Sequence, residues 1–419
     1  MLLVVIDTLR ADALGSYGNP LPASPNLDAF ARRGLRYERA FAHSGWTLPA
    51  TASLLTGLTP DVHRVGRDPA DPQRFGRLDE AVETLAETLG KAGFATGAIV
   101  NNTFLAPEFG LAQGFDTYDY EGALRGDHRS AEATVERALA WIDAAPEPWF
   151  LVVHAMEPHI EYGASGPAAG RFVPRTTRLV PVPFASPERI LRLMQREETL
   201  SPAELEAVVG LYHEEVLSVD LALAPLLERA DLERDLVAIT SDHGEEFFEQ
   251  GGFEHGHTLV SPVTRVPLIL AGRDVAPGTS STIVQHVDLY RTILDAAYVE
   301  APRGARGASL FELPADAART AISENCLYGS DMLSLVDGEH RFLLQLATGS
   351  AAVWRLGADG METERLDGDE LARVAPRMAR ALEAERGSLE AARAVAGPSI
   401  PDEATFESLK SLGYLGEGR

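Results

Sequence analysis

The sequence predicts an α/β protein in which a parallel β-sheet is covered by helices. Five continuous apolar runs, rich in β-branched residues, recur along the 419-residue chain. They occupy residues 2–7, 96–101, 149–154, 236–242 and 266–271. Unbroken runs of this kind are typical of strands buried on both faces, and the segments between them carry apolar residues at helical spacing. This alternation of buried strands and amphipathic helices favours the α/β class.

Four helices and one long loop are predicted between the strands. The helices are expected at residues 24–34, 78–92, 129–144 and 202–230. The third of them stops before the proline pair of the segment APEP. Residues 161–189 are rich in proline and glycine and lack periodicity, which indicates a long surface loop able to act as a lid. The segment HEEVL, inside the fourth helix, is interpreted as a solvated face because it lacks the second histidine of a zinc helix.

The sequence pattern changes near residue 330. Short β-like pieces follow, LSLVDG, RFLLQLA and AAVWRLG, which predict an antiparallel sheet. Helices are expected at 368–395 and 404–412. We therefore place a domain boundary between residues 325 and 330, which gives a catalytic domain at 1–328 and a C-terminal subdomain at 329–419.

Composition excludes several classes of protein. Apolar residues make up 45% and charged residues 24% of the chain, which excludes fibrous and disordered proteins. A net charge of −25, from 37 basic and 62 acidic residues, disfavours nucleic acid and anionic membranes as partners. The single Cys326 cannot form an internal disulfide. No apolar stretch reaches about 18 residues, so we expect a cytoplasmic protein if the recorded start is the natural one.

Acidic residues and histidines follow three of the predicted strands. The first strand ends at Asp7, another ends at Asp242 and His243, and a third ends with His154 and His159. Ligands of parallel sheets gather at the carboxyl ends of the strands. Carboxylate oxygens together with an imidazole nitrogen suit a divalent cation. The alternative is that the two aspartates only cap the helices that follow them.

The segment SGWTLPATASLLTG predicts a short helix. Thr47 is expected at its N-cap, with Pro49 in the first turn and Gly57 as the terminator. A hydroxyl group at a helix N-terminus lies in a positive field that favours negative charge. Thr47 is therefore a candidate nucleophile, and a simple capping role is the alternative.

Seven segments spread along the chain carry a resemblance to a known family. They are DTLRADALGSYG, SPNLDAFARRGLRYERAFA, SGWTLPATASLLTGLTP, HAMEPH, SDHGEEFFEQGGFEHGHT, RVPLIL and SLKSLGYLG, in this order. Together they resemble the sulfatase family of the alkaline phosphatase superfamily. The resemblance implies a three-layer α/β/α sandwich that holds the active site. It also implies a smaller C-terminal α+β domain with a four-stranded antiparallel sheet.

The resemblance implies one divalent metal ion. Asp7, Asp242 and His243 fall on metal ligands, and Thr47 falls on the nucleophile that also touches the metal. Relatives with two metals place further ligands where this chain has His159 and Gly163, so one ion is expected. The oxygen-rich set suits calcium, magnesium or manganese, with zinc as a further option.

The resemblance also implies groups that handle protons and substrate. His159 falls on a substrate-facing histidine. His255 and His257 fall near a second basic group, which is a lysine in many sulfatases, and the sequence leaves open which of the two serves. Asn102 follows a predicted strand and is a candidate for binding substrate oxygens, with a turn-forming role as the alternative.

The nucleophile segment departs from that of the formylglycine sulfatases. Those enzymes carry a CxPxR or SxPxR motif. In this chain Thr47 stands in place of the cysteine or serine, Pro49 matches the proline, and Thr51 stands in place of the arginine. No residue of the motif can become formylglycine. A threonine ester has to be cleaved by water at phosphorus or sulfur, and threonine nucleophiles in the superfamily favour phosphate esters, diesters or phosphonates.

Three functional hypotheses follow. The first is a metal-dependent hydrolase of phosphate or sulfate esters, acting on a small anionic ester through Thr47. The second is a phosphoryl-group transferase that uses the same Thr47 intermediate. The third is a catalytically silent, sulfatase-like binding protein. Whether the chain forms a homo-oligomer is left open.

Overall fold

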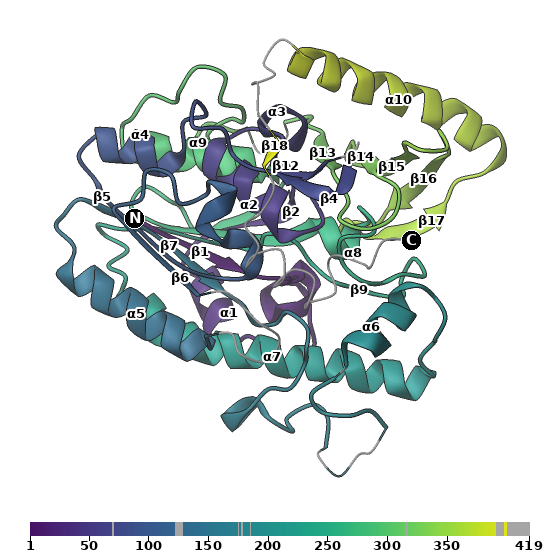
Figure 1. The fold of residues 1–419 in the computed structure, drawn as a ribbon, viewed down its shortest axis with the longest axis horizontal. Helices are drawn as coiled ribbons and strands as arrows, with labels where there is room; N and C mark the ends of the chain where they lie inside the picture. Colours follow the sequence, from purple (N-terminus) through teal and green to yellow (C-terminus); the bar gives the residue numbers. More distant parts are fainter. Residues whose placement is uncertain are drawn as a thin grey trace.

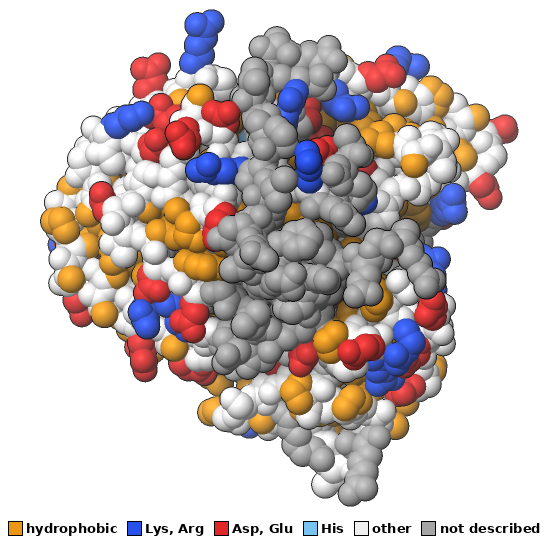
Figure 2. Space-filling model, in the orientation of Figure 1, with side chains coloured by type: hydrophobic (Ala, Val, Ile, Leu, Met, Phe, Trp, Pro, Cys, Tyr) orange, Lys and Arg blue, Asp and Glu red, His pale blue; other side chains and the backbone are white. Residues whose placement is uncertain are grey.

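The structure is a computed structural model, and it describes residues 1–68, 71–121, 129–174, 176, 179–184, 186–314, 317–390 and 398–399. Two layers of helices enclose a large sheet, and a second, smaller sheet stands beside them (Figure 1). On the face drawn in Figure 2, acidic and basic side chains are interspersed among apolar ones. Among the helices in these ranges, none is both long and apolar enough to span a lipid bilayer.

The large sheet contains eight strands in the order β12-β2-β11-β8-β1-β7-β5-β6. Their bounds are β1 Leu2–Ile6, β2 Leu35–Phe41, β5 Ala95–Asn101, β6 Thr117–Glu121, β7 Trp149–Ala155, β8 Leu236–Thr240, β11 Arg265–Gly272 and β12 Gly278–Gln285. All five predicted strands are present. Every residue of β1 is buried, because Leu2, Val4 and Ile6 pack on one face and Leu3 and Val5 on the other.

The sheet is mixed, and in this respect the prediction of a parallel sheet was wrong. β11, which contains the apolar run 266–271, pairs antiparallel with both β2 and β8. The connection from β8 to β11 holds a two-stranded hairpin, β9 (Glu246–Phe247) with β10 (Phe253–Glu254), and the four-residue α8 (Ser261–Thr264). A parallel neighbour needs a crossover connection, usually a helix. Here the chain turns back and re-enters the sheet at the same end at which it left β8, so β11 runs antiparallel to β8.

Helices cover both faces of the large sheet (Figure 1). One layer contains α1 (Pro25–Ala31), α5 (Ala131–Ala144) and α7 (Pro202–Arg229). The other contains α2 (Thr47–Thr56), α4 (Leu85–Lys91) and α9 (His286–Ala296). This arrangement is the three-layer α/β/α sandwich that the resemblance implied. α9 was not among the predicted helices.

Capping boxes fix the first turns of α4 and α7. α4 was expected from residue 78 but begins at Leu85. Thr84 accepts a hydrogen bond from the backbone N–H of Glu87, and the Glu87 carboxylate accepts one from the N–H of Thr84. This reciprocal capping box fixes the first turn of the helix. Ser201 and Glu204 make the same motif at α7, where the expected start agrees with the structure.

The smaller sheet is antiparallel and has five strands, one more than the four that the resemblance implied. Its strands are β13 Ala321–Glu324, β14 Met332–Val336, β15 His340–Gln345, β16 Ala351–Leu356 and β17 Glu362–Arg365. β13 precedes residue 329, which was the expected start of the C-terminal subdomain, so one strand of this sheet lies before the expected boundary. α10 (Gly368–Glu390) packs on this sheet through Val374, Met378 and Leu382. The helix expected at 404–412 lies outside the described residues.

The remaining elements are short. A three-stranded sheet joins β3 (Gly66–Asp68) and β4 (Asp71–Gly76) to β18 (Pro398–Ser399). α3 spans Pro60–His63 and α6 spans Pro187–Met194. Five 3-10 helices complete the described chain. They are η1 Ala11–Ala13, η2 Gly15–Tyr17, η3 Thr103–Leu105, η4 Pro107–Phe109 and η5 Gly166–Ala168.

The segment 161–189 is anchored to the body of the protein. Tyr162 and Phe184 pair across it and are both fully buried. On α7, Glu214 accepts hydrogen bonds from the backbone N–H groups of Gly170, Phe172 and Val173. The interpretation of HEEVL as a solvated face was therefore wrong, because its glutamates face this segment and hold it in place.

Candidate active site

The candidate site lies where β1, β7 and β8 end. These strands are neighbours in the order β8-β1-β7, so their carboxyl ends meet at one place. Asp7 follows β1, Asp242 and His243 follow β8, and His154 is the penultimate residue of β7. All four side chains are at most 1% exposed. Residues from distant parts of the chain are thus gathered at one buried point.

The four side chains form a tight cluster. His243 Nε2 lies 3.5 Å from Asp7 Oδ1 and 3.6 Å from Asp242 Oδ2. His154 Nε2 lies 3.6 Å from Asp7 Oδ2 and 3.9 Å from Asp242 Oδ2. One donor atom each from Asp7, His154 and Asp242 falls within 4.8 Å of the others.

The chemistry of this donor set fits a divalent cation. Asp7 Oδ1, Asp242 Oδ2 and both ring nitrogens of His154 are buried without a hydrogen-bond partner in the described parts of the chain. Buried carboxylate oxygens without partners are costly unless they are paired or coordinate a metal. Two carboxylates with imidazole nitrogens are ligands for manganese, magnesium, calcium or zinc. His154 was noted at its strand end but was not predicted as a ligand.

Burial controls the charge states in the cluster. Burial, together with the negative charge of Asp242, holds the pKa of Asp7 well above its ordinary value. Burial also lowers the pKa of His243 to about 4, so this imidazole is neutral at physiological pH. A neutral imidazole is the form that coordinates metals.

Thr47 is the first residue of α2, and the expectation that it is the N-cap was wrong by one position. Trp46 occupies the cap, and no side chain makes a capping hydrogen bond there. Thr47 Oγ1 is instead directed to the cluster, 3.3 Å from His243 Nε2. The alternative of a simple capping role therefore does not describe this hydroxyl group. It lies within the first turn of α2, where the helix field favours negative charge.

Asn102 joins Thr47 to the cluster. Its Nδ2 donates to Asp7 Oδ2 at 2.7 Å and to Thr47 Oγ1 at 3.2 Å. Its Oδ1 accepts from the N–H of Phe104, so Asn102 is the N-cap of η3. The backbone φ of 93° is one that asparagine tolerates better than most residues. Asn102 therefore forms a turn, as the alternative expected, and its amide also contacts Asp7 and Thr47; that it binds substrate oxygens stays a prediction.

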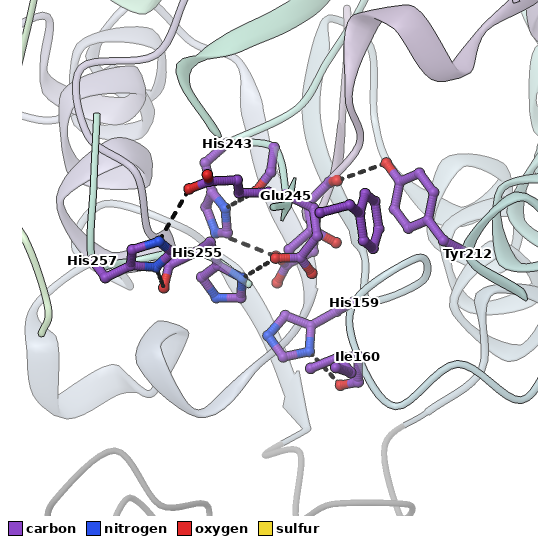
Figure 3. Close-up of polar contacts among 12 residues, drawn as sticks. His159, Ile160, Tyr212, His243, Glu245, His255 and His257 are labelled. Carbon is purple, nitrogen blue, oxygen red and sulfur yellow. Dashed lines mark hydrogen bonds and ion pairs between the residues drawn. The ribbon is translucent and has the colours of Figure 1, made fainter. Parts of the chain in front are cut away.

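Two further histidines stand beside the cluster, and Figure 3 shows their rings side by side below His243. The ring of His255 lies 4.4 Å from that of His243 and 5.1 Å from that of His159, measured between centroids. His255 is 2% exposed and His159 is 8% exposed. Burial lowers the pKa of His255. The structure thus brings His159 and His255 together beside the cluster of Asp7, Asp242 and His243.

His257 has different surroundings. Its Nε2 lies 3.1 Å from Glu246 Oε2, and its side chain is 22% exposed. Burial opposes the charged form, but the hydrogen bond and charge of Glu246 raise the pKa of His257 above its ordinary value. Figure 3 shows His257 set to one side of the other rings. The two histidines that the sequence left undistinguished therefore differ in burial, partner and charge.

Sequence reasoning missed Glu245 and Tyr162. Glu245 Oε1 lies 3.0 Å from His255 Nδ1, and the Tyr162 hydroxyl donates to Glu245 Oε2 at 2.8 Å. Burial raises the pKa of Glu245 to about 7. Glu245 stands two residues after His243, which was the available signal. Tyr162 comes from the segment 161–189, which carries no periodicity from which its position follows.

Comparison with known proteins identifies the family. The Sulfatase family model matches residues 1–299. The chain therefore belongs to the sulfatase family. N-sulphoglucosamine sulphohydrolase from Homo sapiens is 28% identical over 298 residues, which cover 67% of this chain and 57% of that relative. The chain thus spans little more than half the length of this relative.

Solved structures confirm the fold. A 2-O GAG sulfatase superposes with a TM-score of 0.75 at 16% identity, covering 97% of this chain and 95% of that one. A phosphonate monoester hydrolase from Silicibacter pomeroyi superposes with a TM-score of 0.71 at 18% identity, covering 93% and 95%. At these identities the likeness establishes the α/β/α sandwich with its smaller C-terminal domain.

Proposed function

We propose that this chain is a metal-dependent hydrolase of sulfate or phosphate esters in which Thr47 is the nucleophile. One observation carries the proposal. The Thr47 hydroxyl group lies at the start of a helix, 3.3 Å from His243 Nε2, at a buried cluster in which one oxygen of Asp7 and one of Asp242 lack a hydrogen-bond partner among the described residues. A hydroxyl group placed there can be activated and its negative charge stabilised.

The proposed metal ligands are Asp7, Asp242, His243 and Thr47, with His154 adjoining them. A divalent cation bound there would supply positive charge that favours ionisation of a neighbouring hydroxyl group and offsets negative charge on the ester. Asn102 fixes the positions of Thr47 and Asp7 relative to each other, because its Nδ2 donates to Thr47 Oγ1 and to Asp7 Oδ2. The ion would be calcium, magnesium, manganese or zinc.

The reaction then has two steps. Thr47 Oγ1 forms a bond to sulfur or phosphorus, and the bond to the leaving oxygen breaks. One histidine accepts the proton that the Thr47 hydroxyl group loses, and a proton is returned from the histidines to the leaving alkoxide, so that the alcohol departs. Water next attacks the same sulfur or phosphorus atom, breaks its bond to Thr47 and restores the hydroxyl group. The N-terminus of α2 favours the negative charge that develops during both steps.

We assign the proton transfer to His159 and His255. Their rings are neighbours beside His243, and Glu245 fixes the orientation of His255 through Nδ1. His257 is held by Glu246 and carries the raised pKa, so we assign it to attraction of the anionic substrate.

The substrate class rests on the nucleophile and on the relatives. Threonine replaces the formylglycine precursor, so release of sulfate by collapse to an aldehyde is not open to this chain. The structural neighbours include a sulfatase and a phosphonate monoester hydrolase. We therefore propose phosphate monoesters, phosphodiesters, phosphonates and sulfate esters as the range to assay. A transferase would use the same Thr47 intermediate, and transfer to an added alcohol separates it from a hydrolase.

The decisive variant is Thr47→Ala. We expect hydrolysis of every substrate in that panel to fall on the order of 10⁴-fold or more, because the nucleophile is lost. The matched control is Thr56→Ala, which makes the same change at the other end of α2, where Oγ1 donates to the Ala52 carbonyl and accepts from the N–H of Leu58. Thermal unfolding and steady-state rates are measured for both variants. Wild-type turnover in Thr47→Ala would exclude the proposed nucleophile.

A further inference from the structure

Tyr162 links the segment 161–189 to the histidines of the candidate site. Its hydroxyl group donates to Glu245 Oε2 at 2.8 Å, and Glu245 Oε1 lies 3.0 Å from His255 Nδ1 (Figure 3). All three residues are at most 2% exposed. These contacts form a buried chain of hydrogen bonds that begins in a long loop segment and ends at a histidine to which we assign proton transfer.

The Glu245 side chain is held at both of its carboxylate oxygens. Its backbone is fixed separately, since its N–H donates to the Pro262 carbonyl at 3.0 Å and its own carbonyl accepts from Arg10 Nη1 at 3.0 Å. Burial and the charge of Glu245 hold the pKa of Tyr162 well above its ordinary value, so the phenol keeps its proton and is the donor. Because Tyr162 holds Oε2, the direction of Oε1 toward His255 depends on the phenol.

Tyr162 is itself firmly placed by its backbone and by its ring. Its backbone N–H and carbonyl group pair with those of Phe184, at 2.7 and 2.8 Å. Its ring packs edge-on against Tyr212, with the centroids 5.7 Å apart, and lies 6.1 Å from the ring of Phe247. Tyr162→Phe would remove the hydroxyl group and keep these contacts, so it tests the hydrogen bond to Glu245 by itself.

The orientation of His255 determines which ring nitrogen can meet a substrate. The contact with Glu245 occupies Nδ1, whichever of the two atoms carries the shared proton, so Nε2 is the nitrogen left to exchange a proton with a substrate. A displacement of about 1 Å at a reacting group can lower a rate on the order of 10²-fold. The Tyr162 hydroxyl group is therefore placed to affect the reaction without touching the substrate.

We propose that Tyr162 is a positioning residue, which acts through Glu245 to hold His255 in the orientation for proton transfer to the leaving group. The inference rests on the proposed hydrolase function and adds a role for the segment 161–189. The alternative is that Tyr162 only satisfies a buried carboxylate. A lost proton transfer slows esters with poor leaving groups more than esters with good ones, whereas a purely structural loss slows both equally.

The test compares two esters of the anion that the wild type hydrolyses fastest. One is an alkyl ester, whose leaving alkoxide needs a proton, and the other is a nitrophenyl ester, whose leaving group departs without one. For Tyr162→Phe we expect kcat/KM to fall about tenfold or more for the alkyl ester and less than about threefold for the nitrophenyl ester. Tyr37→Phe is the matched control, since it removes a buried hydroxyl group that donates to the Leu310 carbonyl. It should keep the wild-type ratio of the two rates.

A double-mutant cycle shows whether the effect passes through His255. In the His255→Ala background we expect Tyr162→Phe to change the alkyl-ester rate by less than about twofold, because the ring that it positions is absent. An undiminished effect of Tyr162→Phe in that background would overturn the proposal. So would equal losses on the two esters, or a Tyr162→Phe chain whose thermal unfolding shows that it no longer folds.

Thr47→Ala separates this inference from the proposed function. If Thr47→Ala is inactive and Tyr162→Phe hydrolyses both esters as the wild type does, the positioning role is wrong and the proposed function stands. If Thr47→Ala keeps wild-type turnover, the proposed function is wrong and the positioning role falls with it.

Discussion

Two sets of buried acidic residues in this protein differ in what surrounds them. Asp7 and Asp242 are fully buried, and each keeps a carboxylate oxygen without a hydrogen-bond partner among the described residues. Glu214 is equally buried, but its carboxylate accepts three backbone N–H groups, and the neighbouring Glu215 accepts a fourth from Gly163. The first set lies at the ends of sheet strands, and the second lies on a helix under a long segment.

The difference separates a binding role from a structural one. A buried carboxylate that is fully hydrogen-bonded stabilises the fold by satisfying backbone donors. A buried carboxylate with an unused oxygen opposes folding until a ligand or a proton compensates it. Burial alone, which is the same in both sets, does not distinguish them. The number of satisfied acceptor sites does.

The largest expected effect comes from Asp7→Asn, which removes one charge from the unsatisfied set. We expect turnover to fall by at least about 10²- to 10³-fold, because an ionic ligand of the proposed metal is lost. In chelator we expect the variant to unfold at the same temperature as the wild type or higher, since burial and Asp242 already oppose the charge of Asp7. Rates and thermal unfolding are measured with chelator and with added manganese, magnesium or calcium.

Added ions should raise the unfolding temperature of the wild type and not that of Asp7→Asn. The control is Asp12→Asn, the same substitution at a carboxylate that pairs with Arg10. It should keep the response to metal. A loss of stability in chelator as large as that of a Glu214 variant would place Asp7 in the structural set.

The next effect is on folding and comes from Glu214→Ala. The substitution leaves the N–H groups of Gly170, Phe172 and Val173 without their acceptor. We expect the free energy of unfolding to fall by about 3 kcal/mol or more, because each buried unsatisfied donor costs about 1–3 kcal/mol. Urea unfolding measures it. Glu206→Ala, at an exposed position of the same helix, should stay within about 0.5 kcal/mol of the wild type. Equal midpoints for the two variants would mean that the segment is not held by Glu214.

The sequence predicted the interior of the large sheet well and its edges poorly. Strands buried on both faces leave continuous apolar runs, and all five such runs became strands. The two edge strands β12 and β6, and β2 beside β12, were missed because about half or more of their residues are polar or partly exposed. The direction of β11 could not be predicted, because direction depends on where the preceding connection returns the chain and not on the composition of the strand.

The candidate site, too, could be predicted from the sequence only in part. Asp7, Asp242, His243 and Thr47 were predicted from strand ends, a helix start and a family resemblance, and they lie together. The sequence could not show how the surroundings of His255 and His257 differ. Residues two apart on an extended chain face the same side, but Gly256 between them has a φ of 77°, which breaks the extended path. In the structure, His255 contacts Glu245 and His257 contacts Glu246.

The smallest expected effect concerns a third kind of buried acid, one that is compensated by a proton. Glu324 is 5% exposed, and its Oε1 accepts the N–H of Asp61. Burial and the charge of Asp61 raise the pKa of Glu324 from 4.5 to about 8. The folded state therefore holds this proton more tightly than the unfolded state does. The stability it contributes is full below pH 4.5 and is lost as the pH rises through about 8.

Glu324→Gln tests this sign, because glutamine keeps the acceptor for Asp61 and has no proton to lose. Near pH 5 we expect the variant and the wild type to unfold at similar urea concentrations. By about pH 9 we expect the variant to be the more stable by about 1–3 kcal/mol, since only the wild type then buries a charge. Glu339→Gln, at an exposed turn of the same sheet, should show a difference that does not change with pH. A Glu324→Gln curve parallel to the wild type would mean that this carboxyl group is satisfied without a proton, like Glu214.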